Sequence, residues 1–284
     1  MTTTRLKTMT LSGAAAIAIG LALNAPVTAL TPRQQQPPPP PQAQPPAEGA
    51  RQGRAAQAAG PRVNALLISA GAFHDYLYQA NVFAKAVSRA VPNVDWTIAA
   101  QGIDQRTNTR YPIYSRPDWI KGFDIVIHNE CAADVADETF IRSIIAPHAA
   151  NKVPAMVIHC SMHSYRAATV DDWREFLGVT TRNHTPQFKI PVKWSDDPVV
   201  AGLAADWVTP NDELYVILKL WPGAKPIATA VNPTNQTEHP LAWLNTYQGV
   251  RVFGTTLGHG NATWDDPVYQ ELLVRGFKWA IGRN

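Results

Sequence analysis

The chain beyond residue 60 begins with short apolar runs that alternate with segments of helical periodicity. Continuous apolar runs of this length are typical of strands buried on both faces of a parallel sheet. They cover residues 62–71, 94–100, 123–130 and 154–160. Between them, residues 78–91, 136–150 and 171–178 space their apolar side chains as amphipathic helices do. This alternation predicts βαβ units and a mostly parallel sheet.

The pattern changes after Gly178, where strand-like segments follow one another with little helix between them. The segments concerned are residues 187–194, 224–231, 240–247 and 250–258. A last amphipathic segment, residues 267–282, predicts a closing helix. We therefore expect an α/β fold whose C-terminal half adds antiparallel or mixed strands to the sheet.

The N-terminal 61 residues have a different composition and are not expected to join the folded domain. Residues 1–29 carry Arg5 and Lys7, an apolar stretch from Leu11 to Leu23, and small residues before a cleavage position. This pattern indicates a secretory signal peptide, because the apolar run is short and no stop-transfer segment follows. Residues 30–61, rich in Pro, Gln and Ala, are predicted to be an extended linker. The domain is then 62–284, in a protein exported to the periplasm or the cell exterior.

Charge argues against a nucleic acid or a membrane surface as the partner. The full chain has a formal net charge of +3, but five of its basic and only one of its acidic residues lie within residues 1–60. The remaining chain has 20 basic and 21 acidic side chains. A nearly neutral domain lacks the basic surface that polyanions require. We expect a small-molecule partner and no membrane contact after signal cleavage; the sequence leaves the oligomeric state open.

Histidines follow the predicted strands. In an open parallel sheet, ligands bind where strands end and loops begin. Five of the eight histidines are assigned to such positions: His74, His128, His159, His163 and His259. We place His184 and His239 in loops and His148 in a helix tail. This distribution predicts one cleft at the carboxyl edge of the sheet, with imidazoles available for proton transfer or metal binding.

The stretch VIHCSMHSYR, residues 157–166, leaves several roles open for Cys160. No glycine flanks the cysteine, as the sharp turn around a nucleophile would need. A nucleophilic thiolate, a buried bystander and a disulfide with Cys131 therefore all remain as interpretations. A divalent metal is the one candidate cofactor, with ligands from His159, His184 and His259, although the diagnostic zinc spacings are absent.

Two pairs of adjacent carboxylates are candidates for acid/base groups. Asp212 and Glu213 are neighbours, as are Asp265 and Asp266. Adjacent side chains point in different directions, so neither pair alone forms the two carboxylates of a glycosidase. Asp265 and Asp266 precede Pro267 and are predicted to begin a helix. A nucleotide is not supported, because the chain has no glycine-rich phosphate-binding motif.

The motifs together resemble the ThuA-like (trehalose-utilisation) domain family from about Val63 to Arg283. They are GAFHDY, VIHCSMHSY, FLGVTTRNHTPQFKI, NDELY, HPLAWLNTYQGVRVFGTTLGH, TWDDPVY and LLVRGFKWAIG. The most specific part is P-x-A-W followed by G-x-R-V-F-x-T-T-L-G-H. The chain departs from the family pattern at Ile158, where a glycine commonly precedes the histidine.

The resemblance implies a three-layer, flavodoxin-like fold related to class I glutamine amidotransferases. It also implies a role in sugar metabolism, including 3-keto disaccharides and glycosides. The positions that match the family's cleft are His74, Asp75, His159, His184, Glu213 and His259. The related amidotransferases use a cysteine at this strand end, but fold analogy alone does not confer that role on Cys160.

The leading hypothesis is an exported enzyme that acts on a sugar or keto-sugar glycoside, as a hydrolase, lyase or isomerase. Its catalytic candidates are His159, His184, Glu213 and His259, the histidines as ligands or proton-transfer groups and the glutamate as an acid/base or orienting carboxylate. Its substrate-binding candidates are His74, Asp75, Glu130, His163 and Trp243. The alternative is a non-catalytic sugar-binding module on a proline-rich spacer, with Trp194, Trp243 and Trp264 stacking on sugar rings.

Overall fold

The computed structural model describes residues 60–103 and 106–283. The predicted signal peptide and nearly all of the predicted linker lie outside these ranges. Over the described ranges, no helix has the length and apolar character needed to cross a membrane.

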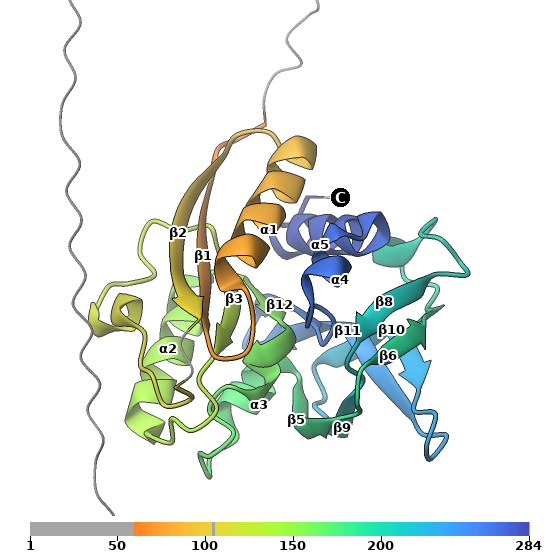
Figure 1. Ribbon diagram of the computed structural model, residues 1–284. Helices are drawn as coiled ribbons and strands as arrows, with labels where there is room; N and C mark the ends of the chain where they lie inside the picture. Colours follow the sequence, from red (N-terminus) through yellow and green to blue (C-terminus); the bar gives the residue numbers. More distant parts are fainter. Residues whose placement is uncertain (1–59, 104–105, 284) are drawn as a thin grey trace, which may run out of the picture. The chain divides into compact units, whose positions relative to one another are not determined.

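An eight-stranded mixed sheet forms the centre of the domain, in the order β2-β1-β3-β4-β12-β11-β10-β7 (Figure 1). Five neighbouring strands are parallel: β1 Val63–Gly71, β2 Val94–Ile103, β3 Ile125–Cys131, β4 Ala155–Ile158 and β12 Val250–Thr255. Three further strands continue the sheet in antiparallel pairing: β11 Glu238–Tyr247, β10 Ala224–Val231 and β7 Lys193–Trp194. The predicted class, a mostly parallel α/β sheet extended by strands of the C-terminal half, is confirmed.

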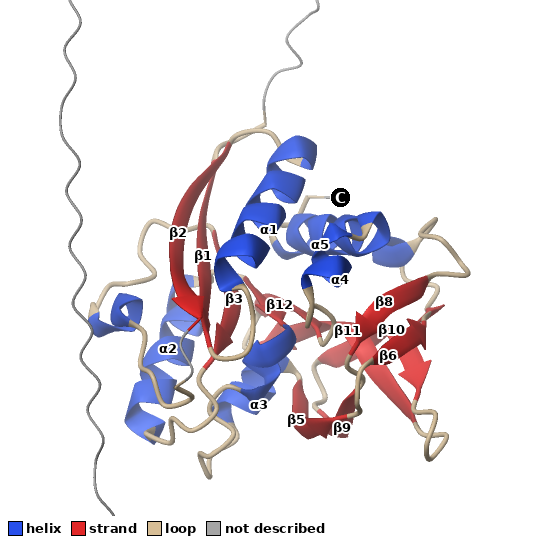
Figure 2. Ribbon diagram, in the orientation of Figure 1, coloured by secondary structure: helices blue, strands red, loops and turns tan. Residues whose placement is uncertain are grey.

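Helices cover both faces of this sheet, which gives three layers (Figure 2). The helices are α1 Tyr76–Ala90, α2 Glu138–Asn151, α3 Asp172–Leu177, α4 Asn261–Asp265 and α5 Pro267–Ala280. Short 3₁₀ helices are η1 Pro112–Ser115, η2 His159–His163 and η3 Pro198–Val200. Consecutive strand residues point to opposite faces, so Leu67 packs with Phe83 of α1 and Phe277 of α5. Leu66 packs on the other face with Ile141 of α2 and Phe176 of α3.

Two small antiparallel pairs stand outside the main sheet. They are β5 Val179–His184 with β9 Tyr215–Leu220, and β6 Phe188–Pro191 with β8 Val208–Asp212. The sequence reading did not identify β5, β8 or β9. Strand β5, VTTRNH, has only one apolar side chain, so it lacks the pattern on which a strand prediction depends. The predicted strand 187–194 is divided after Pro191 between β6 and β7, in two different sheets.

Aspartates begin the long helices. Asp137 accepts the backbone N–H of Phe140 at 3.0 Å at the start of α2. Asp266 accepts the N–H groups of Val268 and Tyr269 at the start of α5, and Pro267 follows it at the first helical position. These bonds satisfy helical N–H groups that have no intrahelical partner. The helix start predicted at Asp265 and Asp266 is confirmed, with Asp266 as the capping residue.

Candidate functional site

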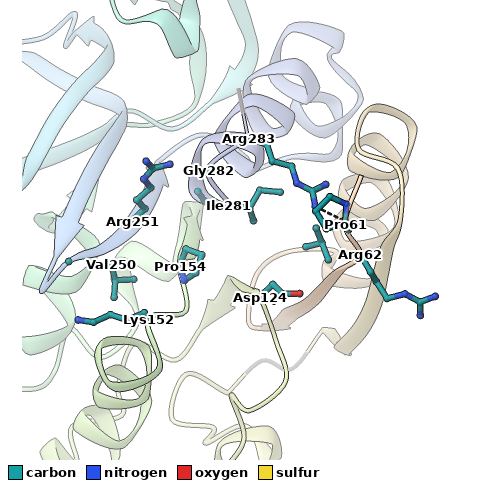
Figure 3. A pocket seen from close by; sticks show the side chains of 13 residues that line it. Pro61, Arg62, Asp124, Lys152, Pro154, Val250, Arg251, Ile281, Gly282 and Arg283 are labelled. Carbon is teal, nitrogen blue, oxygen red and sulfur yellow. Dashed lines mark hydrogen bonds between the residues drawn. The ribbon is translucent and has the colours of Figure 1, made fainter. Parts of the chain in front are cut away.

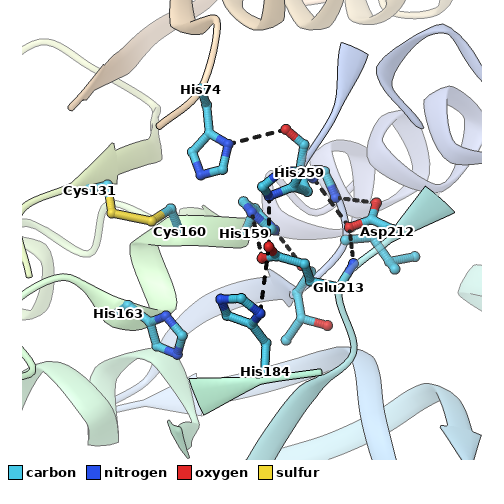
Figure 4. Close-up of polar contacts among 12 residues, drawn as sticks. His74, Cys131, His159, Cys160, His163, His184, Asp212, Glu213 and His259 are labelled. Atoms are coloured by element: carbon cyan, nitrogen blue, oxygen red, sulfur yellow. Dashed lines mark hydrogen bonds and ion pairs between the residues drawn. A yellow bond between two sulfur atoms is a disulfide. The ribbon is translucent and has the colours of Figure 1, made fainter. Parts of the chain in front are cut away.

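Three histidines from distant parts of the chain meet at the carboxyl edge of the parallel strands (Figure 4). His74 follows β1, His159 is the first residue after β4, and His259 follows β12. The ring centroid of His74 lies 4.7 Å from that of His159 and 4.8 Å from that of His259. Each ring offers one nitrogen, and these nitrogens lie within 4.8 Å of one another. The three imidazoles can therefore share a single ligand.

Hydrogen bonds to backbone carbonyls fix the tautomers of His74 and His159. Nδ1 of His74 lies 3.1 Å from the carbonyl oxygen of His259, and Nδ1 of His159 lies 2.7 Å from that of Thr256. A carbonyl oxygen only accepts, so each Nδ1 donates, and each neutral ring keeps a lone pair on Nε2. Nε2 of His159 is buried and has no hydrogen-bond partner among the described residues. Histidine ligands of metals show this arrangement, with the second ring nitrogen donating to a carbonyl.

The pKa values agree with neutral, ligand-ready rings at two of these positions. Burial lowers the pKa of His74 to about 4 and that of His159 well below its usual range. The hydrogen bond with Glu213 raises the pKa of His259. Two neutral imidazoles and one beside a carboxylate are a donor set that suits a divalent ion such as Zn²⁺.

Glu213 contacts two of these imidazoles and also His184. Its Oε1 is 3.1 Å from Nδ1 of His259 and 3.5 Å from Nδ1 of His184. Its Oε2 is 3.7 Å from Nε2 of His159. The side chain is 8% exposed, so these contacts are weakly screened by water. A carboxylate in this position can orient His259 and exchange a proton with a bound ligand.

Asp212 holds the loop that carries His259, a role that the sequence reading did not assign. This carboxylate is fully buried and accepts four hydrogen bonds. The donors are the N–H groups of Glu213, Gly258 and His259 and the hydroxyl of Thr263, at 2.7, 3.0, 3.3 and 2.7 Å. Burial nevertheless raises the pKa of Asp212. The two neighbouring carboxylates thus have different roles: Asp212 supports the loop, and Glu213 faces the histidines.

Strained backbone occurs twice at the site. His159 has a φ of 46° and Phe73 a φ of 81°, both in a region that residues with side chains rarely adopt. Such conformations persist where the surrounding structure over-determines them, and they gather at functional sites. At His159 the turn directs the chain from β4 into η2. The predicted strand 154–160 therefore ends two residues early, at Ile158.

The histidines open onto a cavity of about 330 Å³, a volume within the range of small-molecule sites. One wall is aromatic: the ring of Tyr215 stacks on His163 at 4.4 Å and on His184 at 5.4 Å. Phe73 and Arg166 also line the cavity, together with both cysteines. Of the predicted site residues, His74, His163, His184, Glu213 and His259 line this cavity, and His159 lies against it through its contacts with His74 and Glu213.

A comparison with protein families identifies the family of this chain. The family model described as ThuA, trehalose utilisation, matches residues 65–280. The chain belongs to the ThuA family. This membership associates it with carbohydrate utilisation and confirms the resemblance found in the sequence motifs.

One solved structure supports the fold of this ThuA-family chain, and two others are more distant matches. A putative ThuA-like protein from Parabacteroides merdae matches with a TM-score of 0.58 and 20% identity, covering 78% of this chain and 91% of that one. A putative GMP synthase subunit from Thermoplasma acidophilum matches with a TM-score of 0.45 and 9% identity, covering 78% and 95%. The glutaminase domain of Trypanosoma brucei CTPS matches with a TM-score of 0.44 and 12% identity, covering 78% and 95%. A comparison with curated proteins found no match.

The two cysteines of the ThuA-family chain form a disulfide. Cys131 at the end of β3 is joined to Cys160 of η2, and both line the cavity (Figure 4). Of the interpretations that the sequence left open, the structure shows the disulfide. In this oxidised form Cys160 has no thiol and cannot act as a nucleophile.

Three predicted binding residues of the ThuA-family chain lie outside the cavity lining. Trp243 is fully buried, because its ring packs on Gly254 of the neighbouring strand, where an added Cβ would lie 2.3 Å from it. Asp75 instead caps α1, accepting the N–H of Tyr78 at 3.2 Å. Glu130 is fully buried and accepts a hydrogen bond from Tyr114 at 2.5 Å. In this structure, Trp243 and Glu130 cannot touch a ligand.

Several other histidines have positions that differ from those expected. His128 lies in the middle of β3 rather than at its end, fully buried against Glu130 and His148. His239 lies within β11 and accepts the N–H of Ile217 at 3.3 Å, and His184 is the last residue of β5. His184 is also not part of the three-histidine cluster, where His74 takes the place expected for it. A strand boundary cannot be read where polar residues continue inside a buried strand, and this explains the error at His128.

A second cavity of about 570 Å³ lies at the opposite ends of the strands (Figure 3). Val63 and Val250 begin two of these strands, and Asp124 and Pro154 directly precede two others. The lining has no histidine, and its single carboxylate, Asp124, accepts the N–H of Asn64 at 2.8 Å. Open parallel sheets bind ligands at the other edge, so the three-histidine cavity is the candidate site.

Proposed function

We propose that this ThuA-family chain is a metal-dependent enzyme that acts on a sugar or keto-sugar glycoside. The observation that carries the proposal is the cluster of His74, His159 and His259, with ring nitrogens within 4.8 Å of one another and with Glu213 beside two of them. Three histidines with an open fourth position are a common donor set of catalytic zinc sites. Membership of a trehalose-utilisation family supports a carbohydrate as the substrate.

The side chains divide the chemistry between them. His74, His159 and His259 would hold the ion, which would supply Lewis acidity toward a sugar oxygen. Glu213 would take up or deliver a proton at the reacting sugar, since it lines the cavity beside His259. His184 lies 3.5 Å from Glu213, and its side chain is 38% exposed, so it would relay that proton toward solvent.

We also propose that the protein is exported, as the N-terminal sequence predicts. The disulfide between Cys131 and Cys160 supports this location, because such bonds persist in oxidising compartments and are rare in reducing ones. Expression of the full chain with a reporter at its C-terminus would test it. A processed protein outside the cytoplasm is expected, and a reporter that stays in the cytoplasm at full length would contradict export.

Metal analysis is the first test of the catalytic proposal. The purified protein should contain or bind one equivalent of a divalent metal, and the variants His74→Ala, His159→Ala and His259→Ala should lose it. His239→Ala is the matched control, because His239 is a buried histidine of β11 that does not line the cavity. Equal metal content in all four variants would contradict the proposed site.

Turnover is the second test. Unmodified and 3-keto disaccharides should be screened for product formation with and without chelator, and Glu213→Gln should abolish the metal-dependent product. A protein that binds sugars without metal and forms no product would instead support the alternative, a carbohydrate-binding module. The exposed ring of Phe73 at the cavity is consistent with sugar binding under either function.

A further inference from the structure

Among the described residues, Arg166 is the only arginine or lysine that lines the three-histidine cavity. A guanidinium keeps its charge at any physiological pH and has five N–H donors. In the described part of the chain, its side chain makes one hydrogen bond, from Nη1 to the carbonyl oxygen of Arg182 at 3.3 Å. Within the same ranges, no carboxylate lies at ion-pair distance from it. Most of its donors therefore remain available to a ligand.

The carboxylate of the cavity does not pair with this guanidinium. Of the residues that the structure describes, Glu213 is the only carboxylate in the lining, and it is in contact with His159, His184 and His259 instead. Burial, and then the charge of Arg166, lower the pKa of His163 to about 3, so the guanidinium acts on a ring of the cavity wall. A ligand that fills the cavity would displace water from an unpaired guanidinium, which is costly unless the ligand brings an anion.

The backbone around Arg166 is held in place. The N–H groups of Tyr165 and Ala167 donate to the carbonyls of Ala132 and Ala133, at 3.0 and 3.1 Å. The carbonyl of Arg166 itself accepts from the guanidinium groups of Arg174 and Arg182, each at 3.2 Å. The fixed backbone reduces the conformational freedom that this segment would lose on binding, and so it favours affinity.

Phe73 provides an apolar surface at the same cavity. Its side chain lines the cavity and is 62% exposed, an unusual fraction for a large apolar residue. Its backbone is also in the strained region, with φ at 81°. Strain and exposure both have a cost, so this ring is placed for contact rather than for packing. The C–H face of a sugar ring matches such a surface.

We propose that the cavity selects a sugar that carries a carboxylate, with Arg166 binding the carboxylate and Phe73 packing on the ring. This inference rests on the proposed function, because it names the substrate class of the same site. A planar guanidinium matches a carboxylate with two parallel hydrogen bonds, which neutral hydroxyl groups cannot reproduce. The preferred substrates are therefore glycosides of uronic or aldonic acids rather than neutral disaccharides.

Calorimetric titration with D-glucuronate and D-glucose tests this selectivity directly. The wild-type protein should bind glucuronate about tenfold or more tightly than glucose, as expected for a charge-assisted pair. Arg166→Gln should remove this preference while leaving glucose binding unchanged, and Arg166→Lys should restore part of it. Arg89→Gln is the matched control: Arg89 is exposed in the last turn of α1, outside the cavity lining, and its variant should keep the preference.

Three outcomes would overturn the inference. They are equal binding of both sugars by the wild-type protein, a preference that survives in Arg166→Gln, and an equal loss of both sugars in that variant. Displacement of glucuronate by sulfate at the same concentration would show a site for free anions and would also overturn it. The comparison of two sugars on the wild-type protein remains decisive even if a variant folds poorly.

A second variant separates the two contacts. Phe73→Ala keeps a Cβ, and with it the backbone strain, but removes the ring. This variant should weaken the binding of glucose and glucuronate alike and leave the ratio of the two affinities unchanged. The proposed catalytic function is tested independently. If the protein turns over neutral sugars and binds glucose and glucuronate with equal affinity, only the preference for acidic sugars is refuted. If the protein binds no metal, only the catalytic site is refuted.

Discussion

Asp212 lies beneath the backbone of His259 and accepts its N–H on Oδ1 at 3.3 Å. The same carboxylate also binds the N–H groups of Glu213 and Gly258. One buried side chain at the end of β8 thus joins the segment that carries Glu213 to the loop that carries His259. The geometry of the candidate site depends on this connection.

Asp212→Asn should therefore both destabilise the protein and disturb the site. The amide has one oxygen instead of two, and its NH₂ group would face N–H donors. We expect a loss of about 2–4 kcal/mol in the free energy of unfolding, together with weaker metal binding. Urea unfolding and a Zn²⁺ titration measure the two effects. Asp196→Asn is the control at an exposed position and should change stability by less than about 0.5 kcal/mol.

Much of the fold follows from sequence patterning, for reasons visible in particular strands. β1 and β3 are buried along their length, so their apolar runs stand out. β5 and β9 expose much of their surface, and the polar VTTRNH has no apolar alternation to recognise. Buried strands are therefore readable from composition, whereas strands that depend on pairing with a distant partner are not.

The candidate site could be predicted only in part. Strands β1, β4 and β12 end at one edge, and this rule brought His74, His159 and His259 into the same expected cleft. The direction of individual side chains could not be predicted in this way. Trp243 points into the core because Gly254 leaves space opposite it, and no sequence pattern reports that neighbour. Arg166 was missed for a similar reason: it enters the cavity from a loop that is fixed by distant backbone bonds.

Glu213→Gln should weaken metal binding about 10- to 100-fold, as the loss of a group that orients a metal ligand typically does. The amide keeps the shape of the side chain but removes the negative charge beside His259. Competition between the protein and a chelator for Zn²⁺ measures the affinity. Glu238→Gln removes an exposed carboxylate of β11 and should leave the affinity unchanged. Equal affinities of the wild type and Glu213→Gln would contradict the assigned role.

The disulfide should stabilise the domain. It closes a loop with a sequence separation of 29 between Cys131 and Cys160. Constraining a loop of this length in the unfolded chain contributes about 3.5 kcal/mol. The Cys131→Ala/Cys160→Ala variant should lose this amount in urea unfolding, and a reducing agent should lower the stability of the wild type only. An unfolding midpoint of the wild type that does not respond to reductant would contradict this prediction.

His148 should make the stability of the protein depend on pH below neutrality. Burial first, and then the charge of His128, lower the pKa of His148 to about 3. Nδ1 of His148 donates to the carbonyl oxygen of Val153 at 2.7 Å, so its Nε2 accepts from Nε2 of His128 at 3.1 Å. Protonation of His148 would destroy this second bond and place a charge in the core.

The direction of this pH dependence follows from the pKa of His148 in the unfolded and in the folded chain. In the unfolded chain, His148 binds a proton below about pH 6.5, whereas in the folded chain it stays neutral until about pH 3. Its contribution is complete above the unfolded pKa and is lost as the pH falls, at about 1.4 kcal/mol per pH unit. Between about pH 7 and pH 5, the free energy of unfolding of the wild type should therefore fall by about 2 kcal/mol more than that of His148→Gln. Urea unfolding at several pH values measures the slopes, and parallel curves for the two proteins would show that this buried imidazole is not the source.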